Sequence, residues 1–383
     1  MFNILTLNKI AAVGTSRLGD NYAYGDDVQN PDAVLVRSAA MHDMQFEDNL
    51  LAIARAGAGT NNIPKDVCSE KGIVVFNTPG ANANAVKELV IAGLLLSSRR
   101  VMEGADWAKT LKGNGDAVGK MVEKGKSQFV GPEIKGKTLG VIGLGAIGIL
   151  VANCAVALGM DVIGFDPFMS VTNALKLNPA VKLMKSGDVM VNCDYLTIHV
   201  PLTADTKDMV DADMIAKMKD GVRILNFSRD GLVNSTAVLE AVKSGKVAKY
   251  VTDFATDDII GEENIICLPH LGASTPESED NCAIMACDEL KEYLENGNIV
   301  NSVNYPALSL ARTNTENVRF CVMHKNVPEL LKKVLSEVKG NVENMLSKSR
   351  GDYAYAIIDV AGGNPENAAA IAAIEGVIRV RAI

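Results

Sequence analysis

The sequence predicts an α/β protein with doubly wound parallel sheets, because three observations along the chain agree. Apolar, β-prone segments alternate with helical segments up to about residue 296, a pattern typical of parallel sheets covered on both faces. A glycine-rich turn joins one such strand to a helix at 143–148. After about residue 316 the order becomes strand, helix, two strands, helix and strand, which is the ferredoxin-like arrangement.

The first part of the chain predicts a discontinuous α/β domain, 1–98 plus 276–305. Its strands are expected at 33–37, 53–56 and 74–76, and its helices at 84–97 and 275–296. Residues 303–316 lose this periodicity and contain Pro306, which indicates a linker. A separate C-terminal domain is therefore expected at 316–383.

The glycine turn lies in the context that a dinucleotide site requires. The strand 138–142 precedes it, a helix to Leu158 follows, and the next strand, 161–165, ends at Asp166. The turn itself reads Gly143-Leu144-Gly145-Ala146-Ile147-Gly148. Its glycines let the backbone approach a pyrophosphate at a helix N-terminus, and the carboxylate meets the ribose 2′-hydroxyl. Residues 99–275 are therefore predicted to form the cofactor domain.

Asp166 favours NAD over NADP, because NADP carries a phosphate in place of the 2′-hydroxyl. Two like charges about 4 Å apart repel by roughly 4 kcal/mol at an effective dielectric near 20. Pro167 and Phe168 follow, so no Arg is positioned to receive the phosphate. We expect NAD.

Composition excludes several other classes of protein. The net charge of −8 argues against nucleic acid or an anionic membrane as the main partner. The longest apolar runs, such as 90–96, are too short to cross a bilayer, and the first ten residues do not read as a signal peptide. The 7 cysteines form no C-x-x-C pair and the 4 histidines do not cluster. We expect reduced thiols, a cytoplasmic protein and no metal site.

Three residues that carry chemistry follow predicted strands of the cofactor domain. Arg229 follows strand 223–226, Asp253 ends strand 250–253, and His270 follows strand 265–268. Carboxyl ends of parallel strands meet at one crevice, so a cation, a carboxylate and an imidazole are expected together. This set suits oxidation of an alcohol beside a carboxylate. The imidazole takes the hydroxyl proton as hydride leaves, and the guanidinium binds the substrate.

Further short motifs lie along the chain: Arg55-Ala56-Gly57-Ala58-Gly59, His199-Val200-Pro201-Leu202-Thr203, Asn226–Arg229 and Pro269-His270-Leu271-Gly272-Ala273-Ser274-Thr275. With them the chain resembles the D-isomer-specific 2-hydroxyacid dehydrogenases over nearly its whole length. It is most similar to the short forms that oxidise 3-phospho-D-glycerate to 3-phosphohydroxypyruvate with NAD, the first step of phosphorylated serine biosynthesis. The resemblance implies a Rossmann-type cofactor domain, a flavodoxin-like substrate domain and a C-terminal ferredoxin-like ACT domain.

The resemblance also implies roles for particular residues. Arg229, Asp258 and His270 are the expected catalytic group, although the family has Glu where this chain has Asp258. Asp257, Glu262 and Glu263 are nearby alternatives for the acid that pairs with His270. The residue after the catalytic Arg is Asp230, where the family usually has Gly. Cofactor contacts are implied for Gly143, Gly145, Ala146, Ile147, Gly148, Asp166, Pro167, His199, Val200, Pro201, Asn226, Phe227, Ser228, Asp253, Gly272 and Ala273.

Substrate contacts are expected in the first domain. The backbone at Ala58 and Gly59 could hold a carboxylate, with Asn82 alongside. Arg37, which precedes Ser38, is the expected phosphate ligand, with Lys9 and Arg17 as weaker alternatives.

The C-terminal domain is expected to bind an effector, L-serine, through His324, Asn326 and Asn341. This module usually has Gly after Pro328, where this chain has Glu329. A regulatory role and a purely oligomeric role therefore both stay open. The resemblance implies a homodimer through the cofactor domain, or a homotetramer if ACT domains also pair.

Two other functions stay open. One is reduction of glyoxylate or hydroxypyruvate, against which Arg37 and the ACT-like domain argue. The other is a non-catalytic NAD-sensing protein, which could dispense with the acid–base pair.

Overall fold

The computed structural model describes residues 1–383, and the chain divides into two compact units. The first unit contains Met1–Asn82 and Pro276–Ile383, and the second contains Ala83–Thr275. The boundary therefore falls at Asn82 rather than at the predicted residue 98, and the C-terminal module lies within the first unit. No helix is both long enough and apolar enough to span a membrane.

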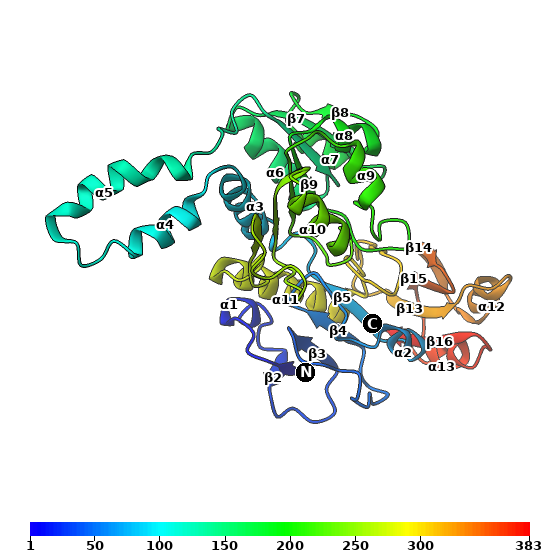
Figure 1. Cartoon of the computed structure of the whole chain (residues 1–383). Helices are drawn as coiled ribbons and strands as arrows, with labels where there is room; N and C mark the ends of the chain where they lie inside the picture. The colour runs from blue at the N-terminus through cyan, green and yellow to red at the C-terminus, as the bar shows by residue number, and fades with distance from the viewer. The chain divides into compact units, whose positions relative to one another are not determined.

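The first unit contains a five-stranded parallel sheet (Figure 1). Its elements are β1 (Phe2–Leu7), α1 (Ala12–Thr15), β2 (Tyr22–Gly25), β3 (Ala33–Val36), β4 (Ala52–Arg55), α2 (Lys65–Glu70), β5 (Val74–Asn77) and α11 (Pro276–Asn296). The strand order is β2-β1-β3-β4-β5 and every pairing is parallel. This is the flavodoxin-like order, so the prediction for this domain is confirmed.

The C-terminal module has the predicted ferredoxin-like order. Its elements are β13 (Val318–Lys325), α12 (Leu330–Glu337), β14 (Asn341–Arg350), β15 (Tyr353–Ala361), α13 (Asn367–Ala372) and β16 (Val377–Ala382). The strands form one antiparallel sheet in the order β14-β15-β13-β16.

The two central strands of this antiparallel sheet, β13 and β15, are buried on both faces, which explains the continuous apolar run of β13, whereas the edge strand β14 is largely exposed. Phe320 and Val322 pack with residues of α12 and α13, in a core that belongs to the module. The alternate residues Cys321 and Met323 belong to the core of the five-stranded sheet instead. Because the two sheets share a core, the module is part of the first unit.

Residues 303–316 form no helix or strand, as predicted, but the segment is packed. Tyr305 and Leu308 are buried in the shared core. Arg319 is fully buried and donates to both oxygens of Asp359, at 2.6 and 2.7 Å. Arg319 also donates to the carbonyl of Asn296 at 2.9 Å. These charge-assisted hydrogen bonds tie the module to the end of α11.

The second unit contains a seven-stranded parallel sheet. Its helices are α3 (Ala83–Ser98), α4 (Val101–Lys109), η1 (Gly115–Ala117), α5 (Val118–Gly125), η2 (Lys126–Phe129), α6 (Ala146–Ala157), α7 (Val171–Lys176), α8 (Ser186–Asn192), α9 (Ala212–Lys217) and α10 (Ser235–Lys243). Its strands are β6 (Thr138–Ile142), β7 (Asp161–Phe165), β8 (Lys182–Leu183), β9 (Tyr195–Ile198), β10 (Val222–Asn226), β11 (Val247–Thr252) and β12 (Ile265–Cys267). The order β12-β11-β10-β9-β6-β7-β8 reverses between β6 and β9. This confirms the Rossmann-type prediction and locates the ligand crevice at that reversal.

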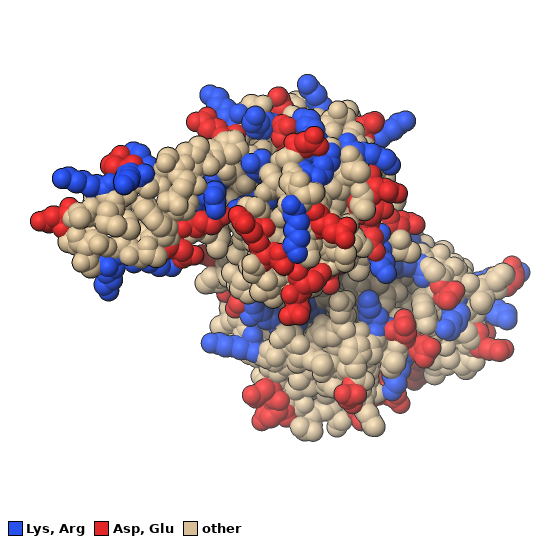
Figure 2. All heavy atoms as spheres, in the orientation of Figure 1, with Lys and Arg blue, Asp and Glu red and all other residues tan.

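An arm formed by α4 and α5 extends from this sheet (Figure 1) and was not predicted from the sequence. Neither helix has a buried residue. The rings of Trp107 and Phe129 pack with centroids 5.4 Å apart, which holds the arm together. Val101, Met102 and Met121 are exposed on it, and in Figure 2 much of the arm is uncharged on the visible face.

Candidate active site

The glycine turn after β6 has the geometry that a pyrophosphate site requires. Gly143 has a φ of +91°, and a Cβ there would overlap the carbonyl oxygen of His199. A Cβ at Gly148 would overlap the carbonyl oxygen of Gly143, so this glycine lets α6 pack closely on the turn. A Cβ at Gly145, in contrast, would have no atom within 4 Å. The first and third glycines therefore shape the turn, and the second faces open space.

The N-terminus of α6 is available to an anion. Gly145 is its N-cap residue and provides no side-chain hydrogen bond to the first turn. The first N–H groups of a helix have no partner within the helix and carry partial positive charge. Open space at Gly145 and an uncapped helix of 12 residues fit the diphosphate of a dinucleotide.

Asp166 lies where the ribose contact was predicted, directly after β7. Its Oδ2 accepts the N–H of Leu144 at 2.9 Å and its Oδ1 accepts the N–H of Phe168 at 2.8 Å. These bonds fix the carboxylate beside the glycine turn. Each oxygen keeps a lone pair for a ribose hydroxyl.

A hydrogen bond joins the two loops at the carboxyl ends of β9 and β10. Ser228 donates its hydroxyl to the carbonyl of Val200 at 2.7 Å, and Asn226 donates its side-chain amide to the carbonyl of Arg229 at 2.9 Å. His199 contacts the hydroxyl of Thr197 through Nε2 at 3.0 Å, and its Nδ1 is buried without a partner. Burial lowers the pKa of His199 to about 4, so its imidazole is neutral near pH 7.

Asp253, His270 and Arg229 follow the neighbouring strands β11, β12 and β10, and the structure brings their charges together. Asp253 is buried, and its Oδ1 has no hydrogen-bond partner. Burial raises the pKa of the Asp253 carboxyl, and the charges of His270 and Arg229 oppose that rise. Its Oδ2 lies 3.5 Å from the position a Cβ would take at Gly272. The buried, unpaired Oδ1 fits a hydrogen-bond donor from a bound ligand.

Asp258, the predicted partner of His270, contacts other residues in this structure. Its carboxylate accepts a hydrogen bond from the Thr256 hydroxyl. The hydroxyls of Thr256 and Ser235 hold the pKa of the Asp258 carboxyl below its usual value. Asp258 forms no ion pair with His270, whereas Asp253 is within electrostatic reach of that imidazole. The shorter Asp side chain is hydrogen-bonded locally in this structure, and its pairing with His270 stays a prediction.

The sequence did not identify Phe254 as part of the site. Its ring meets the imidazole of His270 edge to face, with centroids 5.0 Å apart. The N–H of Phe254 donates to the hydroxyl of Thr252 at 3.1 Å, which orients the loop after β11. An aromatic residue next to a strand-end Asp is the sequence signal that could have indicated this support.

The predicted substrate residues lie in the first unit: Arg37 and Ser38 after β3, Ala58 and Gly59 after β4, and Asn82 after β5. Arg37 forms an ion pair with Glu279, with Nη2 and Oε1 2.7 Å apart. The N–H of Ser38 donates to Oδ1 of Asn8 at 2.9 Å, and the carbonyl of Ala58 accepts the Asn77 amide at 2.6 Å. A phosphate at Arg37 must therefore compete with Glu279. Of the weaker alternatives, Arg17 is bound to Asp288 at 2.6 Å and Lys9 is exposed.

Two of the three predicted effector residues line one cavity of the C-terminal module. His324 and Asn326 lie in its wall, and its volume is about 380 Å³. Nε2 of His324 is buried without a partner. Asn341 does not line this cavity, because it pairs with Ala361 at the opposite end of β14; Ser347, Lys348 and Ser349 line it instead. Glu329, at the usual Gly position, has a φ of +64°, a conformation that favours glycine.

Comparison with known proteins identifies the family. A family profile described as "D-isomer specific 2-hydroxyacid dehydrogenase, NAD binding domain" matches residues 91–272. D-3-phosphoglycerate dehydrogenase 1 of Saccharomyces cerevisiae is 31% identical over 83% of this chain and 70% of that protein. D-3-phosphoglycerate dehydrogenase of Bacillus subtilis is 32% identical over 74% of this chain and 53% of that protein. This chain belongs to the D-isomer-specific 2-hydroxyacid dehydrogenase family.

Solved structures show the same fold. The NAD+-bound 3-phosphoglycerate dehydrogenase of Entamoeba histolytica matches with a TM-score of 0.60 and 24% identity, over 80% of this chain and 99% of that chain. The glyoxylate reductase of Paecilomyes thermophila matches with a TM-score of 0.64 and 24% identity, over 79% and 98% of the two chains. The predicted fold class, enzyme class and NAD-binding domain are confirmed.

Proposed function

We propose that this chain oxidises 3-phospho-D-glycerate to 3-phosphohydroxypyruvate with NAD, as a first step of serine biosynthesis. The observation that carries the proposal is the joint position of Arg229, Asp253 and His270 after three adjacent strands of a dinucleotide-binding sheet. The relatives named as D-3-phosphoglycerate dehydrogenases support the choice of substrate.

The residues of this chain have distinct roles in the proposed reaction. The imidazole of His270 accepts the proton of the substrate hydroxyl. The buried carboxylate of Asp253 stabilises the imidazolium that forms, because an opposite charge favours the charged form. The exposed guanidinium of Arg229 binds the substrate carboxylate and the developing carbonyl oxygen. NAD, when bound, supplies the hydride acceptor.

Other residues of the second unit are proposed to hold NAD. The N–H groups at Gly145, Ala146 and Ile147 bind the diphosphate, and Asp166 binds the ribose. The loops 199–201 and 226–228, with Gly272 and Ala273, border the nicotinamide end. The carboxamide of the nicotinamide is a donor that suits the unpaired Oδ1 of Asp253.

A substitution at His270 tests the chemistry. His270→Gln should lower kcat at least about a hundredfold, because general acid–base catalysis contributes roughly 10²–10⁴-fold. His42→Gln is the matched control, since His42 binds only the carbonyl of Asn61, at 2.8 Å, in the first unit. The assay is NADH formation from 3-phosphoglycerate. Equal rates for the two variants, or no turnover by the unaltered protein, would reject the proposal and favour an NAD-sensing protein.

The reductase alternative differs in its substrate. We propose that Arg37, with Ser38, contacts the substrate phosphate, and that Ala58, Gly59 and Asn82 contact the carboxylate. Arg37→Ala should then raise KM for phosphohydroxypyruvate far more than KM for unphosphorylated hydroxypyruvate. If KM rises equally for both substrates, Arg37 does not bind the phosphate group. That result would favour the alternative function, reduction of glyoxylate or hydroxypyruvate.

The acid that acts on His270 is open to a direct comparison. Asp253→Asn should shift the pH profile of kcat, whereas Asp258→Asn should leave it nearly unchanged, because Asp258 is bound to Thr256 and Ser235. If Asp258→Asn shifts the pH profile of kcat more than Asp253→Asn does, Asp258 is the acid that pairs with His270, as the family resemblance implies.

We also propose a homodimer through the arm of α4 and α5. Neither α4 nor α5 buries a residue, and Val101, Met102 and Met121 are exposed on them, so contact with another chain would bury these side chains. The 10-residue edge strand β14 offers a second pairing surface, which would make a tetramer. Sedimentation of the chain with Met102→Glu and Met121→Glu should show monomers.

L-Serine is proposed as a ligand of the cavity at His324 and Asn326. The unpaired, buried Nε2 of His324 supports a ligand there. An unchanged rate at millimolar L-serine would leave the module with a structural role.

All 7 cysteines are free thiols, which supports a cytoplasmic location.

A further inference from the structure

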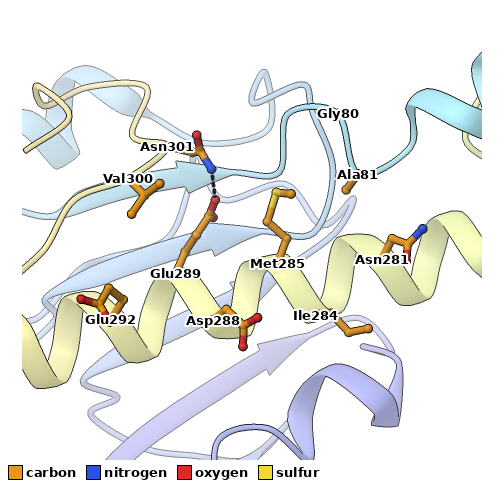
Figure 3. Close-up of a pocket in the computed structure, with 10 residues that line it drawn as sticks. All are labelled: Gly80, Ala81, Asn281, Ile284, Met285, Asp288, Glu289, Glu292, Val300 and Asn301. Atoms are coloured by element: carbon orange, nitrogen blue, oxygen red, sulfur yellow. Dashed lines mark hydrogen bonds between the residues drawn. The ribbon is translucent and has the colours of Figure 1, made fainter. Parts of the chain in front are cut away.

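A second, larger cavity lies along α11 in the first unit. No residue predicted to bind substrate, cofactor or effector lines it, although Asn82 directly follows Ala81 of its wall. Its volume is about 630 Å³. One face of α11, the loop after β5 at Gly80 and the segment after α11 at Val300 form its walls (Figure 3). Ile284 and Met285 give the wall an apolar part.

Glu289 contributes a buried carboxylate to this cavity and is only 5% exposed. Its Oε1 accepts the side-chain amide of Asn301 at 2.6 Å (Figure 3). Its Oε2 is buried and has no hydrogen-bond partner. A buried polar atom without a partner is unfavourable, so this oxygen is expected to meet a donor from a bound molecule.

The other two carboxylates of the cavity already have partners. Asp288 accepts two hydrogen bonds from Arg17, at 2.6 and 2.9 Å. Glu292 accepts the side-chain amides of Asn296 and Asn298. Arg17 compensates the charge of Asp288, and Glu292 adds a negative charge to the wall. Of the three acidic residues, Glu289 alone has an oxygen without a partner.

The acidic lining of the cavity indicates the charge of a molecule that could donate to Oε2 of Glu289. Three acidic side chains and no cationic one line the cavity, which disfavours an anion. A divalent metal ion needs several oxygen ligands at once, and no cluster of residues in the chain could hold one. An ammonium group needs only donors directed at one oxygen, and its alkyl part suits the apolar wall.

We propose that this cavity binds a small organic ammonium ion. Its N–H groups donate to Oε2 of Glu289, and its alkyl part packs on Ile284, Met285 and Val300. No residue assigned to the proposed oxidation lines this cavity.

The ionisation of Glu289 sets the conditions for a test. Burial raises the pKa of the Glu289 carboxyl to about 8; the Asn301 hydrogen bond opposes the rise and the charge of Asp288 adds to it. At about pH 9 the carboxylate is ionised, while an alkylammonium with a pKa near that of lysine, about 10.4, keeps its charge.

The experiment is calorimetric titration of the full chain with n-butylammonium chloride at about pH 9, without NAD or substrate. We expect saturable binding, and at least about tenfold weaker binding to Glu289→Gln, because a charge-assisted hydrogen bond is lost. Glu277→Gln is the control: Glu277 is exposed on the same helix and does not line the cavity. It should bind within about twofold of the unaltered chain.

Titration with n-butanol needs no variant and tests charge recognition directly. The alcohol has the same alkyl part and should bind at least about tenfold more weakly. Three results overturn the proposal: no saturable heat with n-butylammonium at tens of millimolar, equal binding of the alcohol, or unchanged binding by Glu289→Gln.

Discussion

Separate substitutions of Gly145 and Gly148 in the 143–148 turn distinguish effects on folding from effects on cofactor binding. Gly145→Ala is the informative change. Gly145 has a φ of −81°, which alanine adopts without strain, and a Cβ there meets no atom within 4 Å. Its free energy of unfolding should therefore stay within about 1 kcal/mol of the unaltered chain, or rise slightly as the unfolded chain loses freedom.

The same methyl group occupies the space through which a diphosphate reaches the N–H groups of α6. Losing one charge-assisted hydrogen bond there weakens binding by about 1.5–3 kcal/mol, which is roughly a 10- to 150-fold rise in the Kd for NAD. Gly148→Ala should behave differently. Its Cβ would overlap the carbonyl oxygen of Gly143, so α6 must shift, and such crowding costs about 1–3 kcal/mol of stability.

Two measurements test this: calorimetric titration with NAD, and urea unfolding of the chain without cofactor. Gly145→Ala should lose affinity and keep stability, while Gly148→Ala should lose both. Normal NAD affinity in Gly145→Ala would show that the diphosphate does not enter at this turn. Equal destabilisation of the two variants would show that Gly145 serves packing rather than binding.

Three further predictions concern other parts of the chain. Asp166→Ala should reduce the preference of kcat/KM for NAD over NADP by about 10- to 100-fold, since like-charge repulsion at a partly exposed site is screened; an unchanged ratio would remove Asp166 from the ribose site. Arg319→Met should destabilise the chain by about 3–5 kcal/mol in urea unfolding, because it leaves the buried Asp359 unpaired; a loss below about 1 kcal/mol would contradict the role assigned to this pair. Glu289 has a folded-state pKa raised to about 8, so its proton is bound in the folded chain and lost from the unfolded chain between about pH 4.5 and 8. Stability from this group therefore falls as pH rises through that window, by about 1.4 kcal/mol per unit, and Glu289→Gln should abolish that slope; parallel pH–stability curves would show that Glu289 ionises normally.

Local sequence patterns were sufficient for the elements with strong periodicity. The strand predicted at 161–165 is β7, and the helix predicted at 275–296 is α11 within one residue. Neither β1 nor the arm was predicted from the sequence. In the arm, α5 has apolar residues at helical spacing, Val118, Met121 and Val122, but α4 and α5 are short and bury no residue, so the pattern gave only a weak signal.

The sequence predicted which residues belong to the candidate site, but not which side chains contact one another there. Arg229, Asp253 and His270 were predicted as one group because strand-end residues converge in any parallel sheet. That Asp258 binds Thr256 while Asp253 lies near His270 depends on loop geometry, which no periodicity encodes. The same holds for the ion pair of Arg37 with Glu279, residues far apart in the chain.

By itself, the sequence of this protein determined the family, the cofactor and the strand ends that carry chemistry, because each depends on short-range patterns of glycine, charge and apolar spacing. Tertiary structure alone decided which carboxylate lies near the imidazole, that the C-terminal sheet shares a core with the five-stranded sheet, and that Glu289 keeps an unpaired oxygen in a cavity. Those properties depend on burial and on contacts between distant segments, and they exist only once the chain has packed.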